Sequence, residues 1–162
     1  MTSDVRALPE VLTRVRVRHL FHLREAVPPL HVVGGTPNGF RRIGVVAGGA
    51  FEGERLSGQV VSGNDWQDVR NDNCTKLDVR MLLKAMDGAL IVMTYQCLRA
   101  GSAEILAKLD RGEAVDPASY YFRFTALFET SAPEYDWLNR IVAVGIGERL
   151  ADGPLYNVFE IL

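Results

Sequence analysis

The sequence predicts a mainly β protein: a closed or nearly closed antiparallel β-barrel with one short helix. About eight short segments alternate apolar and polar residues, turn residues separate them, and one segment alone has clear helical periodicity. The 162 residues suit a single domain, 1–162, that is long enough to bury a core. Residues 1–12 precede the first alternating segment, and we expect them to form a loose lead-in.

The composition is that of an ordinary globular protein, with 48% hydrophobic and 23% charged residues. A net charge of −2 provides no basic field for nucleic acid, and no apolar run is long enough to span a bilayer. Early charged residues argue against a secretory signal, and Cys74 and Cys97 match neither a disulfide framework nor a zinc motif. We therefore expect a cytoplasmic protein with reduced thiols and no membrane or nucleic-acid partner.

The first strand is expected from Arg14 onward, because the residues there alternate. Val17, His19 and Phe21 then share one face with Val15. Two consecutive prolines after Val27 end the segment, since proline cannot donate to a strand ladder.

The next segments are short and rich in glycine. Residues 31–43 are expected to form a turn-rich loop, and strands are expected at 41–47 and 55–61 on either side of a turn at 48–53. Phe51 in that turn is a candidate core residue. Trp66 follows a polar turn, where it either lines a pocket mouth or packs with its N–H bonded to backbone.

A β-hairpin is the clearest local prediction, because Asp87-Gly88 is a favoured type I′ turn between two apolar-rich strands. A two-residue turn centred there pairs Arg80 with Tyr95. One face of the hairpin then gathers a set of polar and charged residues: Lys76, Asp78, Arg80, Tyr95, Cys97 and Arg99.

The second half of the chain predicts the single helix and three further strands. Gly101-Ser102 begins a helix over 102–111. The strand from Tyr120 to Thr130 has an aromatic face expected in the core and an opposite face that carries Tyr121, Arg123 and Glu129. A turn or short helical segment through Asn139 follows, and strands at 140–149 and 154–162 complete the count.

Seven motifs occur in order after residue 12: Gly48-Gly49-x-Phe51-Glu52-Gly53, Asp65-Trp66 with Arg70, Leu77-Asp78-x-Arg80, Asp87-Gly88-Ala89, Tyr120-Tyr121-Phe122-Arg123, Phe128-Glu129-Thr130 and Trp137-Leu138-Asn139-Arg140. Together they resemble the bacterial and fungal family DUF3237, also called UPF0311. One departure is Asp72-Asn73, where relatives often carry Asp-Gly, so the loop before Asp78 is expected to differ in shape.

The resemblance implies a compact barrel of lipocalin-like or allene-oxide-cyclase-like architecture that is often oligomeric, and we expect a homodimer. Most members of the family have no assigned activity. A few fungal relatives look like cofactor-free cyclases that close oxygen heterocycles on aromatic polyketides.

The candidate site combines the hairpin with the strand from Tyr120. We predict that Asp78 or Glu129 transfers a proton, since burial can raise the pKa of a carboxyl group towards neutrality. Arginines could hold an oxyanion of the substrate. The predicted substrate-binding residues are Trp66, Arg80, Tyr95, Arg99, Tyr121, Arg123 and Asn139. An outward-facing network of ordinary ion pairs explains the same residues equally well.

No cofactor or metal is expected. Residues 34–39 lack the lysine and the following helix of a phosphate-binding loop, and Gly145-Ile146-Gly147 lacks the third glycine of a dinucleotide motif. His19 and His22 point to opposite strand faces and cannot chelate together without a bend in the strand. No Gly-x-Ser-x-Gly nucleophile motif occurs, and neither cysteine has an adjacent histidine.

Two functions remain open at this point. The first is a cofactor-independent isomerase, cyclase or lyase that acts on a small hydrophobic, oxygenated compound. The second is a lipocalin-like carrier that binds a similar ligand without chemistry. A buried carboxylate facing the arginines would favour the enzyme, whereas a wide apolar cavity with charges only at its rim would favour the carrier.

Overall fold

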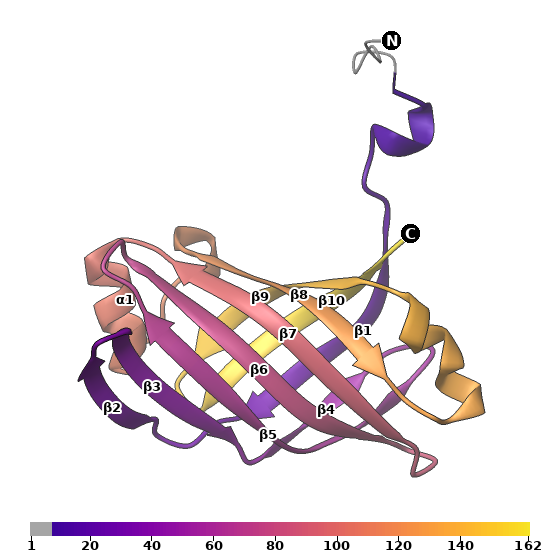
Figure 1. Ribbon diagram of the computed structural model, residues 1–162, viewed down its shortest axis with the longest axis horizontal. Coiled ribbons are helices and arrows are strands. Elements are labelled where there is room, and N and C mark those ends of the chain that lie inside the picture. The colour runs from indigo at the N-terminus through magenta and orange to yellow at the C-terminus, as the bar shows by residue number, and fades with distance from the viewer. Residues whose placement is uncertain (1–7) are drawn as a thin grey trace.

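The computed structural model describes residues 8–162, which form one antiparallel sheet, one α-helix and three 3-10 segments (Figure 1). The helical segments are η1 (Glu10–Leu12), α1 (Ala103–Asp110), η2 (Pro117–Ser119) and η3 (Pro133–Arg140). The strands are β1 (Val17–Ala26), β2 (His31–Thr36), β3 (Gly39–Val46), β4 (Gly48–Glu52), β5 (Ser57–Val69), β6 (Cys74–Ala85), β7 (Leu90–Ala100), β8 (Tyr121–Glu129), β9 (Ala143–Leu150) and β10 (Gly153–Ile161).

The sheet closes on itself, which confirms the predicted antiparallel barrel. Its order is β2-β3-β5-β4-β1-β10-β9-β8-β7-β6, and β6 also pairs with β5. The closed ring therefore runs through β5, β4, β1, β10, β9, β8, β7 and β6. The strand β5 is long enough to pair first with β4 and then with β3 along one edge, while β6 follows its other edge.

Two segments predicted as turns are strands. The expected loop at 31–43 is the hairpin of β2 and β3, which extends the sheet beyond the closed ring. The expected turn at 48–53 contains β4, which pairs with β1 and β5. A Cβ at Gly49 would lie 2.0 Å from the carbonyl oxygen of Arg24, so glycine is needed here for close strand approach rather than for a turn.

A β-bulge in β1 changes the face that this strand buries. The strand begins at Val17 rather than at Arg14, and its register against β10 shifts between His19 and Phe21. Leu20 and Phe21 are consequently both buried, and from Phe21 onward every second residue of the strand is buried. The predicted shared face of residues 15–21 is therefore wrong, and Glu25 enters the barrel.

Aromatic rings fill the centre of the barrel, as the alternation in β8 predicted. Phe122, Phe124 and Phe128 are all buried, and the ring centroids of Phe124 and Tyr156 lie 4.9 Å apart. A Cβ at Gly145 would lie 2.1 Å from the Phe124 ring. The small residues of β9 therefore accommodate these rings.

The two ends of the barrel are covered differently (Figure 1). The helix α1 confirms the predicted helix and lies at one end, where the Ser102 hydroxyl accepts a hydrogen bond from the Ile105 N–H at 3.2 Å. The segment η3 lies at the other end and buries Leu138. Within residues 8–162, no helix combines the length and hydrophobicity needed to cross a membrane.

Replacing Phe124 by alanine should lower the free energy of unfolding by about 3–5 kcal/mol, because the change leaves a cavity beside Tyr95 and Tyr156. The matched control is Phe40→Ala on β3, where the ring is 42% exposed, and its cost should stay below about 1 kcal/mol. Chemical denaturation of both variants measures the difference. Equal losses would contradict the packing described above.

Candidate functional site

The register of the β6–β7 hairpin determines which side chains enter the barrel. Ala85 and Ala89 form a hydrogen-bonded pair across the turn, with the Ala85 N–H donating to the Ala89 carbonyl at 2.9 Å. Three residues, Met86 to Gly88, lie between them, and Gly88 has a φ of +92°. This is the longer hairpin connection that ends in a glycine with positive φ, and it displaces the predicted two-residue register by one position.

The displacement moves two predicted site residues to the outside of the barrel. Val79 pairs with Tyr95, and Arg80 pairs with Thr94. Because side chains alternate along a strand, a shift of one residue separates Asp78 and Arg80 from Tyr95 and Arg99. The prediction that these four share one face is therefore wrong: Asp78 and Arg80 are exposed, whereas Tyr95 and Arg99 are buried.

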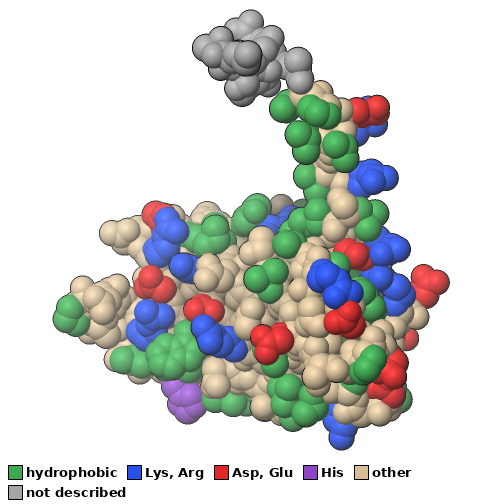
Figure 2. Space-filling model, turned by 45° about the vertical axis from the view of Figure 1, so that its right-hand side comes forward, with side chains coloured by type: hydrophobic (Ala, Val, Ile, Leu, Met, Phe, Trp, Pro, Cys, Tyr) green, Lys and Arg blue, Asp and Glu red, His purple; other side chains and the backbone are tan. Residues whose placement is uncertain are grey.

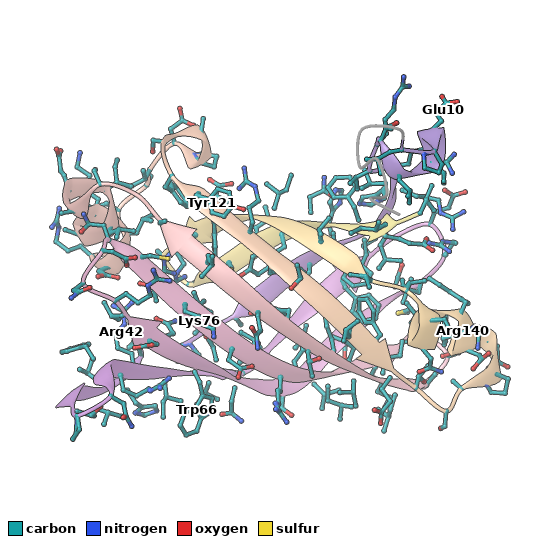
Figure 3. The ribbon with its side chains drawn as sticks, turned by 45° about the horizontal axis from the view of Figure 1, so that its top comes forward. Glu10, Arg42, Trp66, Lys76, Tyr121 and Arg140 are labelled. Atoms are coloured by element: carbon teal, nitrogen blue, oxygen red, sulfur yellow. The ribbon has the colours of Figure 1, made fainter. Side chains whose placement is uncertain are left out.

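The other predicted residues also lie outside, in contrast to the expected pocket within the barrel. Tyr121 is 53% and Trp66 51% exposed, and both lie on the outer surface (Figure 3). Arg123 packs its guanidinium 5.1 Å from the Tyr121 ring. Glu129 is exposed at the end of β8, because it shares the outward face of that strand with Tyr121 and Arg123.

Asn139 has a structural position. Its side-chain oxygen accepts the Thr130 N–H at 2.8 Å, and its amide donates to the Thr130 carbonyl at 2.9 Å. These bonds hold η3 against the end of β8. Asp78 and Arg80 line one outer groove of about 510 Å³, and Tyr121 and Arg123 line a neighbouring one of about 690 Å³.

A different set of polar residues lies inside the barrel, between the aromatic core and the α1 end. We call it the inner polar cluster: Glu25 from β1, Asp65 and Gln67 from β5, Tyr95 and Arg99 from β7, and Tyr156 from β10. All of these side chains are buried. Of the predicted site residues, only Tyr95 and Arg99 belong to the cluster.

Hydrogen bonds join members of the cluster in pairs but leave others unused. The Tyr95 hydroxyl donates to the Glu25 carboxyl at 2.8 Å, and the Gln67 amide donates to Asp65 Oδ2 at 2.6 Å. Among the described residues, four buried polar atoms of the cluster have no partner: Asp65 Oδ1, Gln67 Oε1, Arg99 Nε and Tyr156 Oη. Since unpaired buried polar atoms are costly, the cluster has hydrogen-bonding capacity that the fold alone does not use.

Burial separates the titration of the two carboxyl groups. Desolvation raises the pKa of Glu25 to about 8, and the charge of Asp65 adds to this effect against the hydrogen bond from Tyr95. Desolvation also raises the pKa of Asp65 to about 6, but the Gln67 hydrogen bond and the charge of Arg99 oppose it. At neutral pH, Glu25 is therefore mainly protonated and Asp65 mainly ionised.

The phenol and thiol groups near the cluster stay protonated. Burial raises the pKa of the Tyr95 and Tyr156 hydroxyls well above their ordinary value, and it also raises the pKa of the Cys97 thiol. A protonated, buried thiol is a poor nucleophile. The reactive groups of the cluster are thus its carboxyls.

The cluster opens towards a larger cavity at the α1 end. The inner cavity around the cluster is small, about 10 Å³, whereas the outer cavity between α1 and the loop after β1 has a volume of about 610 Å³. Both are lined by Val27, Leu30, Arg99 and Arg149. Figure 3 shows Arg42, a further residue of the outer cavity, at the same end of the barrel.

No metal site accompanies this arrangement in the described part of the chain, where no three His, Cys, Asp or Glu side chains lie together as ligands. The polar atoms of the cluster are instead carboxylate, amide, phenol and guanidinium groups. These groups can form hydrogen bonds with the oxygen atoms of a ligand, and the carboxyl groups can transfer protons.

The sequence patterns did not identify five residues that lie at or beside the cluster: Glu25, Asp65, Gln67, Arg149 and Tyr156. A signal existed for the first, because Leu23, Glu25 and Val27 alternate as buried residues, and a carboxylate in such a series is unusual. Asp65 and Gln67 likewise alternate around the exposed Trp66.

Glu25→Gln should change how stability depends on pH. Between pH 4.5 and about 8 the unfolded chain ionises Glu25 while the folded protein keeps its proton. The free energy of unfolding of the native protein should therefore fall across this window, on the order of a few kcal/mol. Glutamine cannot ionise, so the free energy of unfolding of the variant should fall much less over the same pH range.

Denaturation with urea at several pH values measures the effect, and Glu129→Gln provides a control at an exposed carboxyl group. Parallel profiles for the native protein and Glu25→Gln would contradict the raised pKa.

Proteins with sequences similar to this chain have the same barrel fold. A UPF0311 protein from Rhodopseudomonas palustris is 34% identical over 149 residues, which cover 91% of this chain and 97% of the relative. A solved structure of a conserved protein of unknown function from the same species has a TM-score of 0.88 and covers 92% of this chain and 99% of that chain.

Two further structures extend the comparison. A β-barrel-like protein from Acinetobacter baumannii is 38% identical with a TM-score of 0.81, covering 96% of this chain and 99% of its own. A structure described as an enzyme from Penicillium herquei has a TM-score of 0.72 and covers 96% and 98% of the two chains, but its 22% identity shows the fold alone. The family model for proteins of unknown function DUF3237 matches residues 15–161, and the chain belongs to this family.

Proposed function

We propose that this protein is a cofactor-independent enzyme, an isomerase, cyclase or lyase, that moves protons on a small hydrophobic, oxygenated molecule. The observation that best supports the proposal is the burial of Glu25 and Asp65 in one cavity with pKa values of about 8 and about 6. Two carboxyl groups whose environments separate their pKa values are suited to act as an acid and a base at the same pH.

The proposed roles follow from the state of each group at neutral pH. Asp65 is the base, and its Oδ1 has no hydrogen-bond partner among the described residues. Glu25 is the acid, and the hydrogen bond from Tyr95 holds its carboxyl group in position. A group with a pKa near the working pH is effective in either role.

A cyclisation illustrates how the atoms balance. The Asp65 carboxylate takes the proton of a substrate hydroxyl, whose oxygen then bonds to one carbon of a double bond. The other carbon takes the proton of the Glu25 carboxyl. The product is an isomer of the substrate, and a proton returns from Asp65 to Glu25 through water. No further reactant is consumed.

The shape of the interior argues against the alternative of a lipocalin-like carrier. The inner cavity of about 10 Å³ is close to the space that one water molecule requires, and large aromatic rings occupy the rest of the barrel. A ligand of ordinary size would instead occupy the outer cavity and present its reacting group to the cluster. The likeness to a fungal protein described as an enzyme is compatible with catalysis.

Proton exchange tests the proposal without knowledge of the natural substrate. Phenylpyruvate and a panel of aromatic hydroxy ketones are incubated with the protein in heavy water, and nuclear magnetic resonance follows deuterium uptake at carbon. Asp65→Asn should slow the exchange that the native protein catalyses by at least about a hundredfold, because it removes the base while keeping its size.

The matched control is Asp78→Asn, a change to an exposed carboxylate on the outer surface. It should leave exchange unchanged. The proposal fails if no compound of the panel exchanges faster with the native protein than with Asp65→Asn.

We also propose a symmetric homodimer. Large apolar side chains are exposed on the outer face of neighbouring strands, with Leu98 41%, Leu127 58% and Ile146 47% exposed. The segment before β1 stands clear of the barrel (Figure 2), and Val11 and Val15 on it are 75% and 77% exposed. Apolar patches of this kind commonly mark protein interfaces.

Light scattering at micromolar concentration tests the dimer. The native protein should have twice the 17.9 kDa mass of the chain, and Leu127→Lys should shift the mass towards the monomer by burying a charge in the interface. A native protein of monomeric mass would refute this assignment.

A cytoplasmic location is a further part of the proposal. Cys74 and Cys97 are both free and buried, as is common for proteins of reducing compartments.

A further inference from the structure

We propose that Arg99 and Arg149 form a binding site for the carboxylate group of an apolar small molecule that occupies the outer cavity. The inference rests on the proposed function in one respect, since the same molecule would be the substrate. It identifies the chemical class of that substrate.

Arg99 is a buried cation that forms no direct ion pair within the described structure. The residue is 3% exposed, and its Nε has no hydrogen-bond partner. The ring centroid of Phe122 lies 5.6 Å from the guanidinium carbon. A guanidinium group removed from water needs hydrogen-bond acceptors, and an aromatic ring supplies no charged acceptor.

Arg149 lies beside Arg99 at the junction of the two cavities. Its guanidinium donates to the Leu150 carbonyl, which carries no charge. Burial lowers the pKa of Arg149, and the positive charge of Arg99 lowers it further. An anion placed between the two side chains would relieve both effects.

The other arginines of the outer cavity already have carboxylate partners. Arg42 pairs with Asp110 at 3.1 Å, and Arg111 pairs with Glu113 at 2.6 Å. The ion pairs of residues 8–162 include neither Arg99 nor Arg149. The two guanidinium groups at the junction are therefore the ones available to a ligand.

The net charge at the junction of the two cavities indicates that the ligand is a monoanion. Arg99 and Arg149 contribute two positive charges, and the ionised Asp65, whose field reaches both, offsets one of them. Glu25 is mainly neutral at the same pH. One positive charge remains, and a carboxylate matches both this charge and the planar hydrogen-bonding geometry of a guanidinium group.

The outer cavity suits the apolar part of such a molecule. Val27, Pro28 and Leu30 line it on one side, and Leu109 of α1 lines it on the other. Its volume of about 610 Å³ lies in the usual range for small-molecule pockets, roughly 300–1,000 Å³. The ligand would thus rest its apolar body against these side chains and direct its carboxylate inward.

Naphthoate and its neutral isostere naphthamide test the charge requirement on the native protein by isothermal titration calorimetry. Naphthoate should bind at least about tenfold more tightly, because its carboxylate makes charge-assisted hydrogen bonds. Equal affinities, or no binding of naphthoate, would overturn the inference. This comparison requires no mutation and remains decisive if a variant fails to fold.

Arg149→Gln locates the site. The glutamine keeps a donor for the Leu150 carbonyl but removes the charge, so the dissociation constant of naphthoate should rise at least about tenfold. The matched control is Arg123→Gln on the outer surface, where the arginine likewise donates to a neighbouring carbonyl, that of Phe122. An equal change in both variants, each shown by thermal melting to be folded, would contradict the assignment.

Asp65→Asn separates this inference from the proposed function. The variant should lose proton exchange, yet it should bind naphthoate at least as tightly as the native protein, because a nearby negative charge is gone. A native protein that binds naphthoate preferentially but exchanges no proton supports the anion site and refutes the catalytic proposal. Exchange without preferential binding of naphthoate refutes the anion site alone.

Discussion

The pairing of β5 with β6 is the interaction on which the rest of the structure depends. It joins the two ends of the eight-stranded ring, so no edge of that ring is left unpaired and inward side chains are removed from water. Asp65 and Gln67 lie on β5, and Tyr95 and Arg99 lie on β7, the other neighbour of β6. Without closure these side chains would face solvent, and the pKa values that support acid–base chemistry would not arise.

Much of the fold could be predicted because local patterns determine it. The aromatic alternation of β8 and the capped start of α1 involve only neighbouring residues, and both predictions are confirmed. The predicted position of the hairpin is confirmed, but its predicted register is wrong, because Asp87-Gly88 is compatible with both a two-residue and a three-residue connection. That ambiguity moved Asp78 and Arg80 from the inside to the outside of the barrel, whereas Tyr121, Arg123 and Glu129 lie outside because they share the outward face of β8.

Local patterns mark Glu25 as an unusual carboxylate in an apolar series but do not determine which way it faces, and they give no signal for Arg149. The bulge after His19 determines whether Glu25 faces inward, and it depends on the pairing of β1 with strands far away in the sequence. Arg149 meets Arg99 only because β9 and β7 flank β8 in the closed ring. Polar side chains meet inside a barrel only when distant strands pair. Sequence patterns therefore identify Tyr95 and Arg99 as candidates but do not identify their partners.

The inner polar cluster is a destabilising feature that the surrounding structure supports. Its unpartnered buried atoms cost free energy, and so does the like charge of Arg149 near Arg99. The packing of Tyr95 against Phe124, with ring centroids 4.5 Å apart, contributes stability beside them. Such local strain is common where a protein binds or transforms a ligand.

The aromatic filling of the barrel has a kinetic consequence. Phe21, Phe51 and Phe128 pack together, and η3 covers that end, so the outer cavity beside α1 is the way into the cluster among the described residues. A dead-end pocket exchanges substrate and product through one opening. Under the proposed function, product would therefore have to depart before the next substrate enters, and a product that retains its carboxylate would compete directly with substrate for the same arginines.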